Sequence, residues 1–564
     1  MKRWIAFSAV VLLGVMAVVR SEQKKVDVSA SPEALLYLIA DTEQELTRMP
    51  VSFTRMSDEE EIRIGDQLAR YYGAQQERNK SPEAIVVERY LRQVGGPLAA
   101  RAHRKLPYKF HYIPNSYFIN AFALPGGHVF VGGGLLALMD SEDELAAVIG
   151  HEIEHVDHYH CAERVQQQEA LRKIPLGELI ALPIEVFEAG YSKDQEMEAD
   201  REGTRLAVQA GYSASGAIRM FETFQRLYKE YQAKAQTPQE EVSQVARQTL
   251  EGYFRSHPQP SERIAQVQKL IASEGWTVRP ERDLAVGYIF RTDRAKRALE
   301  AHQYAEAEQL ATRSLQMQAG QEQALEVLAK AQFAQAKFAD SASAYRRLLE
   351  AQGWTIHVAD EYALALAAAD RRSAAGQFRE WMDSAHGDTH DLQVPMAGLL
   401  LFAGEPDAAI RAVDSAHENA GNGWSPIWLG KLGWWYYLSG NYQKASDLLS
   451  EATQQRPGDT QLWIRLAWTQ IEIRRFSNAV QVVANSPSEK WQAERAMSVA
   501  VAFWQAKEPD EAMSSFSGAV ANQPEWENPA WVKALYSPLA AQSVSEMQAE
   551  RERRAKNARN AAGR

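Results

Sequence analysis

Apolar and polar positions follow two different patterns along the chain. Residues 31–280 mix helical periods with one strand-like patch, in which β-branched and aromatic residues cluster at Lys109–Ile113 and again at Gly127–Val131, between glycine and proline breaks. Residues 290–540 show no strand pattern, and one amphipathic helical period follows another. The pattern predicts an α+β, mostly helical N-terminal domain over residues 31–285 and an all-helical domain over residues 290–540.

The second region also repeats a short sequence feature. An aromatic residue or a proline is followed three residues later by a small residue, at Tyr304/Ala307, Phe338/Ser341, Pro406/Ala409, Tyr442/Ala445, Phe476/Ala479 and Pro509/Ala512, with a weaker unit at Arg372/Ala375. The units keep one register with a spacing of about 34 residues, which is typical of tetratricopeptide repeats. We therefore expect a helical solenoid.

Twelve of the fourteen tryptophans lie at or beyond Trp354, inside this repetitive region. Buried aromatic side chains dominate the packing of protein cores, so we expect them to fill the solenoid and seal its end. The alternative interpretation is a groove that holds apolar segments of a client protein.

The two ends of the chain differ from its body. Lys2 and Arg3 precede a charge-free stretch, Trp4–Val19, which is typical of an export signal and short for a membrane-spanning helix. We expect residues 1–30 to be a cleaved signal peptide, with a retained N-terminal anchor as the alternative. The last fourteen residues carry six basic side chains against one acidic side chain, and we expect residues 541–564 to be a basic, disordered tail.

Composition excludes some classes of function. The chain has 564 residues, of which 45% are hydrophobic and 24% are charged, as in ordinary globular proteins. Its formal net charge of −11 argues against nucleic-acid binding, which needs a basic face. Cys161 is the single cysteine, so no disulfide can form within the chain.

The segment that follows Ser141 contains a metal-binding pattern. Ser141 and Glu144 form a capping-box sequence that predicts the start of a helix. His151 and His155 are four residues apart on this helix, so their imidazoles project from one face and can bind one metal ion. Glu152 can reach a metal-bound water without being a ligand. This is the arrangement of His-Glu-x-x-His zinc peptidases.

A catalytic zinc site needs a third protein ligand and one open position. One class of such enzymes continues with a glycine at position 158 and a histidine at position 161, but this chain has His158 and Cys161 there. The alternative is a glutamate on a second helix, and Glu196 and Asp200 are four residues apart there. Glu196 can bind the metal while Asp200 accepts a proton from the outer nitrogen of a ligand histidine. The other interpretation of these carboxylates is a solvated acidic helix face.

From Asn115 to Arg263 the sequence resembles the HtpX-like and CAAX-prenyl-endopeptidase family of gluzincin metallopeptidases. The matching segments are Asn120-Ala121-Phe122, Pro125-Gly126-Gly127, Gly134-Leu135-Leu136, His151 to His155, Glu196 to Asp200, and His257-Pro258 with Arg263. The sequence departs from the family at Glu154, where a small or apolar residue is usual. Glu154 is predicted to face away from the ligand pair, so we expect little effect.

The resemblance implies roles for individual residues. Three of them would hold one zinc ion per chain, namely His151, His155 and Glu196. Glu152 would be the general base. Strand Gly127–Val131 would be the sheet edge that pairs with the backbone of an extended substrate, a known mode of peptide recognition.

Other positions near the motif are less determined. His257 would stabilise the oxyanion or occupy the fourth zinc position when no client is bound, and a turn histidine before a proline is the alternative. We expect surface or packing roles for His158 and His160. Between the two ligand helices, Ile174–Phe187 is too short to span a bilayer, and we expect a lid or core helix rather than a membrane-dipping segment.

These features together predict an exported zinc metalloendopeptidase. Glu152 would take a proton from the attacking water and pass it to the leaving amine. The resemblance implies a periplasmic location and a role in envelope quality control and outer-membrane protein assembly. Unfolded or stalled envelope proteins and the outer-membrane assembly machinery would then be the partners. The alternative function is a periplasmic chaperone or scaffold whose zinc site is structural or rarely used.

Overall fold

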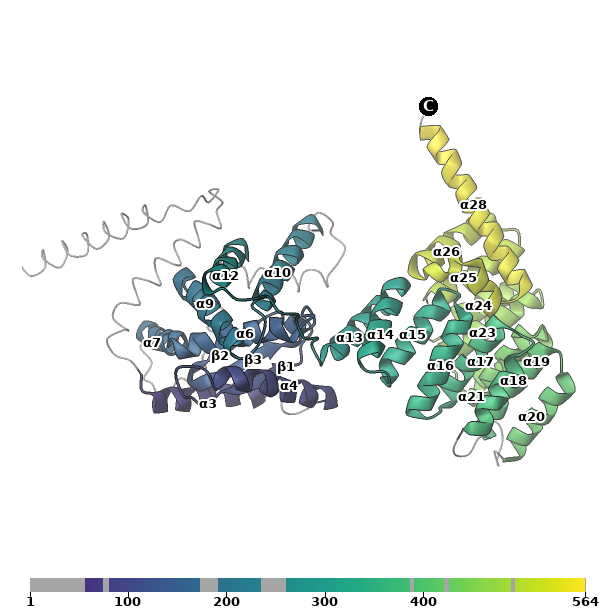
Figure 1. The fold of residues 1–564 in the computed structure, drawn as a ribbon. Coiled ribbons are helices and arrows are strands. Elements are labelled where there is room, and N and C mark those ends of the chain that lie inside the picture. The colour runs from purple at the N-terminus through teal and green to yellow at the C-terminus, as the bar shows by residue number, and fades with distance from the viewer. Residues whose placement is uncertain are drawn as a thin grey trace, which may run out of the picture. The chain divides into compact units, whose positions relative to one another are not determined.

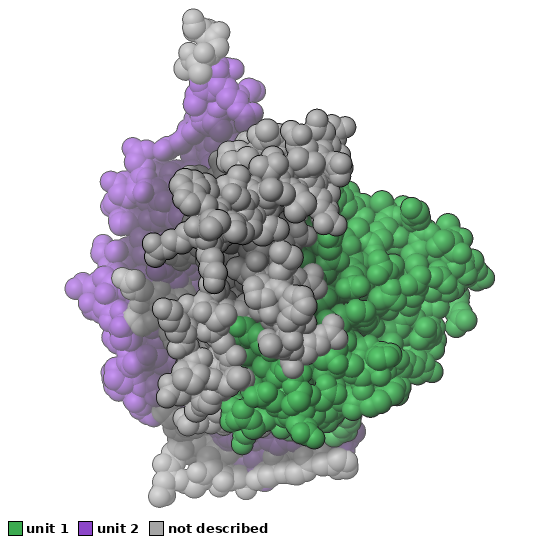
Figure 2. All heavy atoms as spheres, turned by 90° about the vertical axis from the view of Figure 1, so that its left-hand side faces the viewer, with its two compact units in different colours: residues 1–290 green, residues 291–564 purple. Residues whose placement is uncertain are grey.

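The computed structural model describes residues 56–74, 81–172, 191–234, 260–385, 390–419, 426–487 and 492–562. The chain divides into two compact units, residues 1–290 and residues 291–564, which are coloured separately in Figure 2. Within the described ranges, no helix combines the length and the apolarity that a bilayer crossing requires. The predicted signal peptide, the Ile174–Phe187 segment and His257 lie outside the described residues.

The N-terminal unit combines a small sheet with helices (Figure 1). Its described strands are β1 (Lys109–Ile113), β2 (Ala121–Leu124) and β3 (His128–Gly132). Its described helices are α3 (Asp58–Ala74), α4 (Pro82–Ala99), α5 (Gly133–Leu136), α6 (Glu142–Asp157), α7 (His160–Arg172), α9 (Lys193–Gln209), α10 (Ser215–Lys234) and α12 (Pro260–Glu274), with a 3-10 turn η2 (Pro125–Gly127).

The sheet has the strand order β1-β3-β2. β1 runs parallel to β3, with Lys109 opposite His128, and β2 runs antiparallel to β3, with Ala121 opposite Val131. The prediction that the Gly127–Val131 run forms the sheet edge was therefore wrong. β3 is the central strand because β2, a run of only four residues that the pattern did not predict, pairs with its other side.

Both faces of the sheet are buried, because the side chains of each strand alternate between two apolar clusters. Phe122 and Phe130 pack with Ile64 of α3 on one face. Ala123 and Val129 pack with the core around α6 on the other face, where that core also contains Leu145, Ile149 and Ile153. Helix α6, which carries the His-Glu-x-x-His motif, thus packs against one face of the sheet.

The C-terminal unit is helical throughout its described residues. In chain order the helices are α13 (Gly287–Glu300), α14 (Tyr304–Met317), α15 (Glu322–Ala334), α16 (Phe338–Gln352), α17 (Ile356–Ala369), α18 (Ala374–Ser384), α19 (Gln393–Ala403), α20 (Pro406–Asn419), α21 (Pro426–Leu438), α22 (Tyr442–Gln455), α23 (Thr460–Glu472), α24 (Phe476–Ala484), α25 (Gln492–Gln505), α26 (Pro509–Asn522), α27 (Pro529–Leu535) and α28 (Pro538–Ala562). The 3-10 turns η4 (His390–Leu392) and η5 (Pro524–Glu527) interrupt this series.

The predicted repeat register is confirmed by the helix boundaries. The aromatic or proline of each of the six strong units is the first residue of a helix, in α14, α16, α20, α22, α24 and α26. The small residue three positions later is at most 1% exposed in every unit, at Ala307, Ser341, Ala409, Ala445, Ala479 and Ala512. A small side chain there lets neighbouring helices approach closely, which gives the solenoid its repeating contact.

Several tryptophans of this unit lie in its interior. Six of them are buried in one apolar cluster, namely Trp381, Trp428, Trp435, Trp468, Trp526 and Trp531. Trp468 and Trp526 both lie against Tyr536, with ring centres 4.8 Å and 4.7 Å away. These contacts agree with the expected role of the tryptophans in core packing.

The expectation of a disordered tail was wrong, because helix α28 continues to Ala562. Its first half buries Ala540, Val544 and Met547, which lie on one helical face. Farther along, Arg554 pairs with Glu550 one turn earlier and with Asp510 of α26. The helix was not predicted because the prediction rested on the basic residues at the end of the chain. The apolar residues that pack this helix against the unit precede them.

Candidate metal centre

Helices α6 and α9 meet through two glycines. A Cβ atom on Gly203 would lie 2.6 Å from the backbone nitrogen of His151, and one on Gly150 would lie 2.7 Å from the carbonyl oxygen of Gly203. Only glycine fits at both positions, since a side chain on either would push the helices apart. The contact lies beside His151 and therefore brings the motif of α6 close to the carboxylates of α9.

Both helices begin at capping boxes that set which residues face this contact. Ser141 Oγ accepts a hydrogen bond from the Glu144 backbone at 3.1 Å, which confirms the predicted start of α6. Ser192 and Gln195 form the corresponding box at the start of α9. Glu196 therefore falls in the first turn of α9, where its carboxylate points toward the two histidines of α6.

Three predicted ligand side chains converge at this point. The Nε2 atoms of His151 and His155 are 3.0 Å apart. The Glu196 carboxylate oxygens lie 3.5 Å from His151 Nε2 and 3.7 Å from His155 Nε2. A tetrahedral zinc ion with Zn–N bonds of about 2.0–2.1 Å holds two ligand nitrogens about 3.3 Å apart, so this two-histidine, one-glutamate set fits zinc.

Asp200 and Arg263 hold the outer side of His151. Asp200 Oδ1 is 2.8 Å from His151 Nδ1, and Arg263 binds both Asp200 oxygens, at 2.5 Å and 2.6 Å. Burial alone would raise the pKa of Asp200, but the charge and hydrogen bonds of Arg263, with the contact to His151, lower this pKa below its usual value. An ionised Asp200 accepts a hydrogen bond from Nδ1–H of His151, so that Nε2 of this ring faces the metal position.

Arg263 is a residue whose role the sequence pattern did not predict. It was part of the family resemblance, but it lies far along the chain from the motif and carries a charge opposite to that of the carboxylates of the site. Its guanidinium also stacks on Phe221 of α10, 4.2 Å from the ring centre. The family resemblance included Arg263, but only the folded structure shows that it pairs with Asp200.

Glu152 lies beside the ligand pair in a dry environment. Its side chain is buried, and it accepts a hydrogen bond from the backbone of Ala123 in β2. Burial raises the pKa of Glu152 to about 7, although the neighbouring His151 and Arg263 oppose the shift. A carboxylate with a pKa near neutrality can both take up and release a proton at physiological pH.

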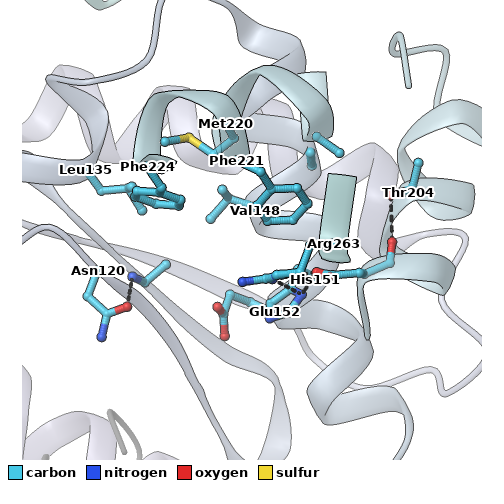
Figure 3. A pocket seen from close by; sticks show the side chains of 14 residues that line it. Asn120, Leu135, Val148, His151, Glu152, Thr204, Met220, Phe221, Phe224 and Arg263 are labelled. Atoms are coloured by element: carbon cyan, nitrogen blue, oxygen red, sulfur yellow. Dashed lines mark hydrogen bonds and ion pairs between the residues drawn. The ribbon is translucent and has the colours of Figure 1, made fainter. Parts of the chain in front are cut away.

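A cavity of about 40 Å³ opens next to Glu152 and His151 (Figure 3). One wall is apolar and comes from α5, α6 and α10, with Leu135, Val148, Met220, Phe221 and Phe224. The polar residues of the lining are Asn120, His151, Glu152, Asp200, Thr204 and Arg263. An apolar side chain placed in this cavity would hold its own backbone beside Glu152.

The two histidines that follow the motif have different environments. His158 is partly exposed, and its Nδ1 lies 3.0 Å from the buried carboxylate of Glu154. This pair stays apart from the three converging ligand atoms, in line with the small effect expected of Glu154. His160 is 1% exposed, so the surface alternative was wrong for this residue, and its Nδ1 lies 3.0 Å from Nδ1 of His155.

Tyr191 is a second contributor that sequence reasoning missed. Its ring stacks on the imidazole of His155 with a centre-to-centre distance of 4.0 Å, and its hydroxyl lies 3.2 Å from Cys161 Sγ. No motif signals this tyrosine. Cys161 is buried, as expected of a small apolar side chain. His257 lies outside the described residues, so its predicted role at the zinc remains a prediction.

Comparison with known proteins agrees with this geometry. Residues 86–271 match the model of Peptidase family M48, and residues 436–500 match a tetratricopeptide repeat model. These two segments are thus similar to a metallopeptidase domain of family M48 and to tetratricopeptide repeats. Both the expected class of enzyme domain and the expected fold class are confirmed.

Several curated proteins are similar to this chain. It is 30% identical over 237 residues to the putative beta-barrel assembly-enhancing protease of Vibrio cholerae, a match that covers 38% of this chain and 44% of the relative. The beta-barrel assembly-enhancing protease of Escherichia coli is 30% identical over 178 residues, with 27% and 35% covered. The mitochondrial metalloendopeptidase OMA1 of Schizosaccharomyces pombe is 30% identical over 161 residues, with 27% and 47% covered. The chain therefore spans less than half the length of each of these relatives.

Among solved structures, a tetratricopeptide repeat protein from Parabacteroides merdae matches 46% of this chain and 98% of its own chain. Its TM-score is 0.30 and its sequence identity is 12%.

Proposed function

We propose that this protein is a zinc metalloendopeptidase whose C-terminal repeats bind client proteins. The observation that carries the proposal is the convergence of His151, His155 and Glu196, with donor atoms all within 4.8 Å of one another, beside the buried carboxylate of Glu152. Buried donors of this kind, next to a cavity that contains a candidate general base, are what metal-assisted hydrolysis requires.

In the proposed reaction, His151, His155 and Glu196 would hold zinc, which would act as a Lewis acid toward the scissile carbonyl and the attacking water. Glu152 accepts a proton from that water and delivers it to the leaving amine. Asp200 keeps the imidazole of His151 in one orientation, and Arg263 keeps Asp200 ionised. Apolar walls around Glu152 exclude bulk water from the proton transfer.

An extended substrate would run along β2, the sheet edge that faces α6. The Gly132 backbone nitrogen donates to the Asn120 carbonyl oxygen at 3.0 Å, so Asn120 directs its main chain toward β3. Because the backbone groups of an antiparallel strand alternate in direction, the N–H and C=O groups of Ala121 and Ala123 point toward the outer edge of the sheet. Glu152 and Cys161 contact the backbone of Ala123, and Ala121 lines the cavity. A substrate backbone would therefore add at the Ala121 carbonyl oxygen, since the Ala121 backbone nitrogen donates to Asn120 Oδ1 at 3.0 Å.

The names of the relatives suggest where this activity operates. Two of them are called beta-barrel assembly-enhancing proteases. We infer that the present protein also acts in the periplasm, on unfolded or stalled envelope proteins and with the machinery that assembles outer-membrane proteins. Its repeat unit would recruit these clients, since solenoids of this type bind partners along an extended surface.

The test is the substitution Glu152→Gln in the purified full-length protein. We expect the variant to keep its fold and one zinc per chain, while cleavage of an unfolded protein such as β-casein falls by at least about 10²-fold. Glu154→Gln, on the same helix but paired with His158, is the matched control and should cleave normally. Undiminished cleavage by Glu152→Gln would contradict the proposed base.

The repeats also favour a second candidate function, a scaffold or chaperone. A complementation experiment separates the two functions. If Glu152→Gln restores every loss-of-function phenotype and deletion of residues 290–540 restores none, scaffolding is the main role.

A further inference from the structure

The two histidines of the candidate metal centre have different partners on their outer nitrogens. His151 faces the carboxylate of Asp200, whereas Nδ1 of His155 faces another imidazole nitrogen, Nδ1 of His160, at 3.0 Å. The other ring nitrogen of His160 lies 3.5 Å from the carboxylate of Glu198. Glu198 is on α9, two residues beyond Glu196. Polar side chains therefore follow one another from His155 through His160 to Glu198 of α9.

A turn that Arg104 stabilises places His160 between His155 and Glu198. Helix α6 ends at Asp157, and Tyr159 adopts φ 62°, a left-handed conformation that non-glycine residues rarely take. Arg104 stabilises the turn from outside, because it donates to the Val156 carbonyl oxygen at 2.6 Å and stacks 3.7 Å from the centre of the Tyr159 ring. The left-handed residue separates α6 from α7, and the imidazole of His160, the first residue of α7, lies against His155 of α6.

The positions of the protons follow from the ligand geometry. Two Nδ1 atoms at 3.0 Å share one hydrogen, so one donates and the other accepts. Nε2 of His155 faces His151 and Glu196, so this is the nitrogen that would bind a metal. A neutral imidazole that binds through Nε2 carries its proton on Nδ1. His155 therefore donates, His160 accepts, and the proton of His160 sits on the nitrogen that faces Glu198.

An imidazole suits this position for an electrostatic reason. The buried centre already contains the carboxylates of Glu152, Glu196 and Asp200. Another buried carboxylate behind His155 would add a charge whose desolvation is costly. A histidine acceptor orients His155 without adding that charge, and the carboxylate at the end of this series, Glu198, is partly exposed to solvent.

We propose that His160 is a positioning residue for the metal: its Nδ1 accepts a hydrogen bond from the Nδ1–H of His155 and thereby holds that ligand in the tautomer and orientation that zinc needs. The proposal rests on zinc binding by the proposed ligand set, but not on proteolysis. It assigns to His160 the role toward His155 that Asp200 has toward His151.

The test compares His160→Leu with His160→Asn in the full-length protein. Leucine and asparagine have nearly the same shape, but only asparagine places an acceptor oxygen where Nδ1 of histidine stood. We expect zinc affinity, measured by chelator competition, to fall about 10- to 100-fold in His160→Leu and to stay within about threefold of the original in His160→Asn. The visible absorption spectrum of the Co²⁺-substituted protein should change in the leucine variant alone.

His158→Leu and His158→Asn are the matched controls, since His158 pairs with Glu154 rather than with a ligand. Both should keep the original zinc affinity. A folded His160→Leu variant with unchanged zinc affinity would overturn the proposal, and so would a folded asparagine variant as weak as the leucine variant.

If His160→Leu does not fold, a crystal structure of the zinc-loaded protein decides instead. Nδ1 of His155 within hydrogen-bond distance of His160 supports the proposal, and a different acceptor overturns it. Zinc affinity is measured independently of cleavage, so loss of the proposed peptidase function would not be mistaken for failure of this inference.

Discussion

Gly150 and Gly203 are in backbone contact across α6 and α9, and a Cβ atom on either would approach the other helix to 2.7 Å or less. This contact sets the distance between the two histidines on one helix and the glutamate on the other. The metal centre therefore depends on two residues that have no side chain and bind nothing.

Gly203→Ala should separate the two helices. The added methyl has no free space, and overpacking of this kind costs about 1–3 kcal/mol of unfolding free energy. Zinc affinity should fall as well, because Glu196 moves with α9. Gly96→Ala is the control, since a Cβ there has nothing within 4 Å and alanine favours a helix. Thermal unfolding with and without zinc measures both effects, and a Gly203→Ala protein of original stability and zinc affinity would contradict this account.

Val148→Phe should change which peptides are cleaved. Val148 lines the apolar wall of the cavity beside Glu152, and a larger side chain there removes space for an apolar substrate side chain. We expect kcat/KM for peptides with leucine or valine next to the scissile bond to drop about 10- to 200-fold, and peptides with glycine there to be less affected. The control is Val86→Phe at an exposed position of α4. An equal loss for all peptides would argue against a role of this cavity in specificity.

The stability of the N-terminal unit should fall below neutral pH through His128. Burial holds the pKa of His128 below its ordinary value of 6.5, with a further contribution from the charge of Lys109, although the hydrogen bond to Asp66 opposes the shift. The unfolded chain therefore binds a proton near pH 6.5 that the folded chain does not. The contribution of His128 to the free energy of unfolding is therefore complete above about pH 6.5. It decreases as the pH falls toward the pKa of His128 in the folded state.

His128→Gln should lose this pH dependence, which amounts to at most about 1.4 kcal/mol per pH unit for one proton. Hydrogen exchange of the β1 and β3 amides, corrected for the intrinsic effect of pH, measures it. The exposed His103→Gln variant serves as the control and should behave as the original protein does. Identical pH profiles for His128→Gln and the original protein would refute the assignment.

Ala307→Leu should destabilise the C-terminal unit by about 1–3 kcal/mol, because this residue is fully buried between repeat helices. Ala305→Leu, in the same turn of α14 but exposed, should have little effect. Urea unfolding followed by tryptophan fluorescence reports on this unit, since twelve of the fourteen tryptophans lie at or beyond Trp354. Equal midpoints for the two variants would show that the small residues do not set the helix spacing.

Much of this protein could be predicted from local pattern. The helix starts at Ser141 and at the six repeat units, the pairing of His151 with His155, and the position of Glu196 on a second helix all follow from residues within one or two helical turns of one another. Helical periodicity, capping and i,i+4 spacing are properties of a short segment, so the sequence by itself determined them.

The tertiary structure decided the rest. Whether β3 is an edge or a central strand depends on pairing with β2, and Arg263 and Tyr191 reach the histidines from segments far along the chain. The sequence pattern assigns His160 no more than a surface or packing role, and its contact with His155 depends on the turn at Tyr159. These features depend on which distant segments pack together, and a pattern along the chain does not contain that information.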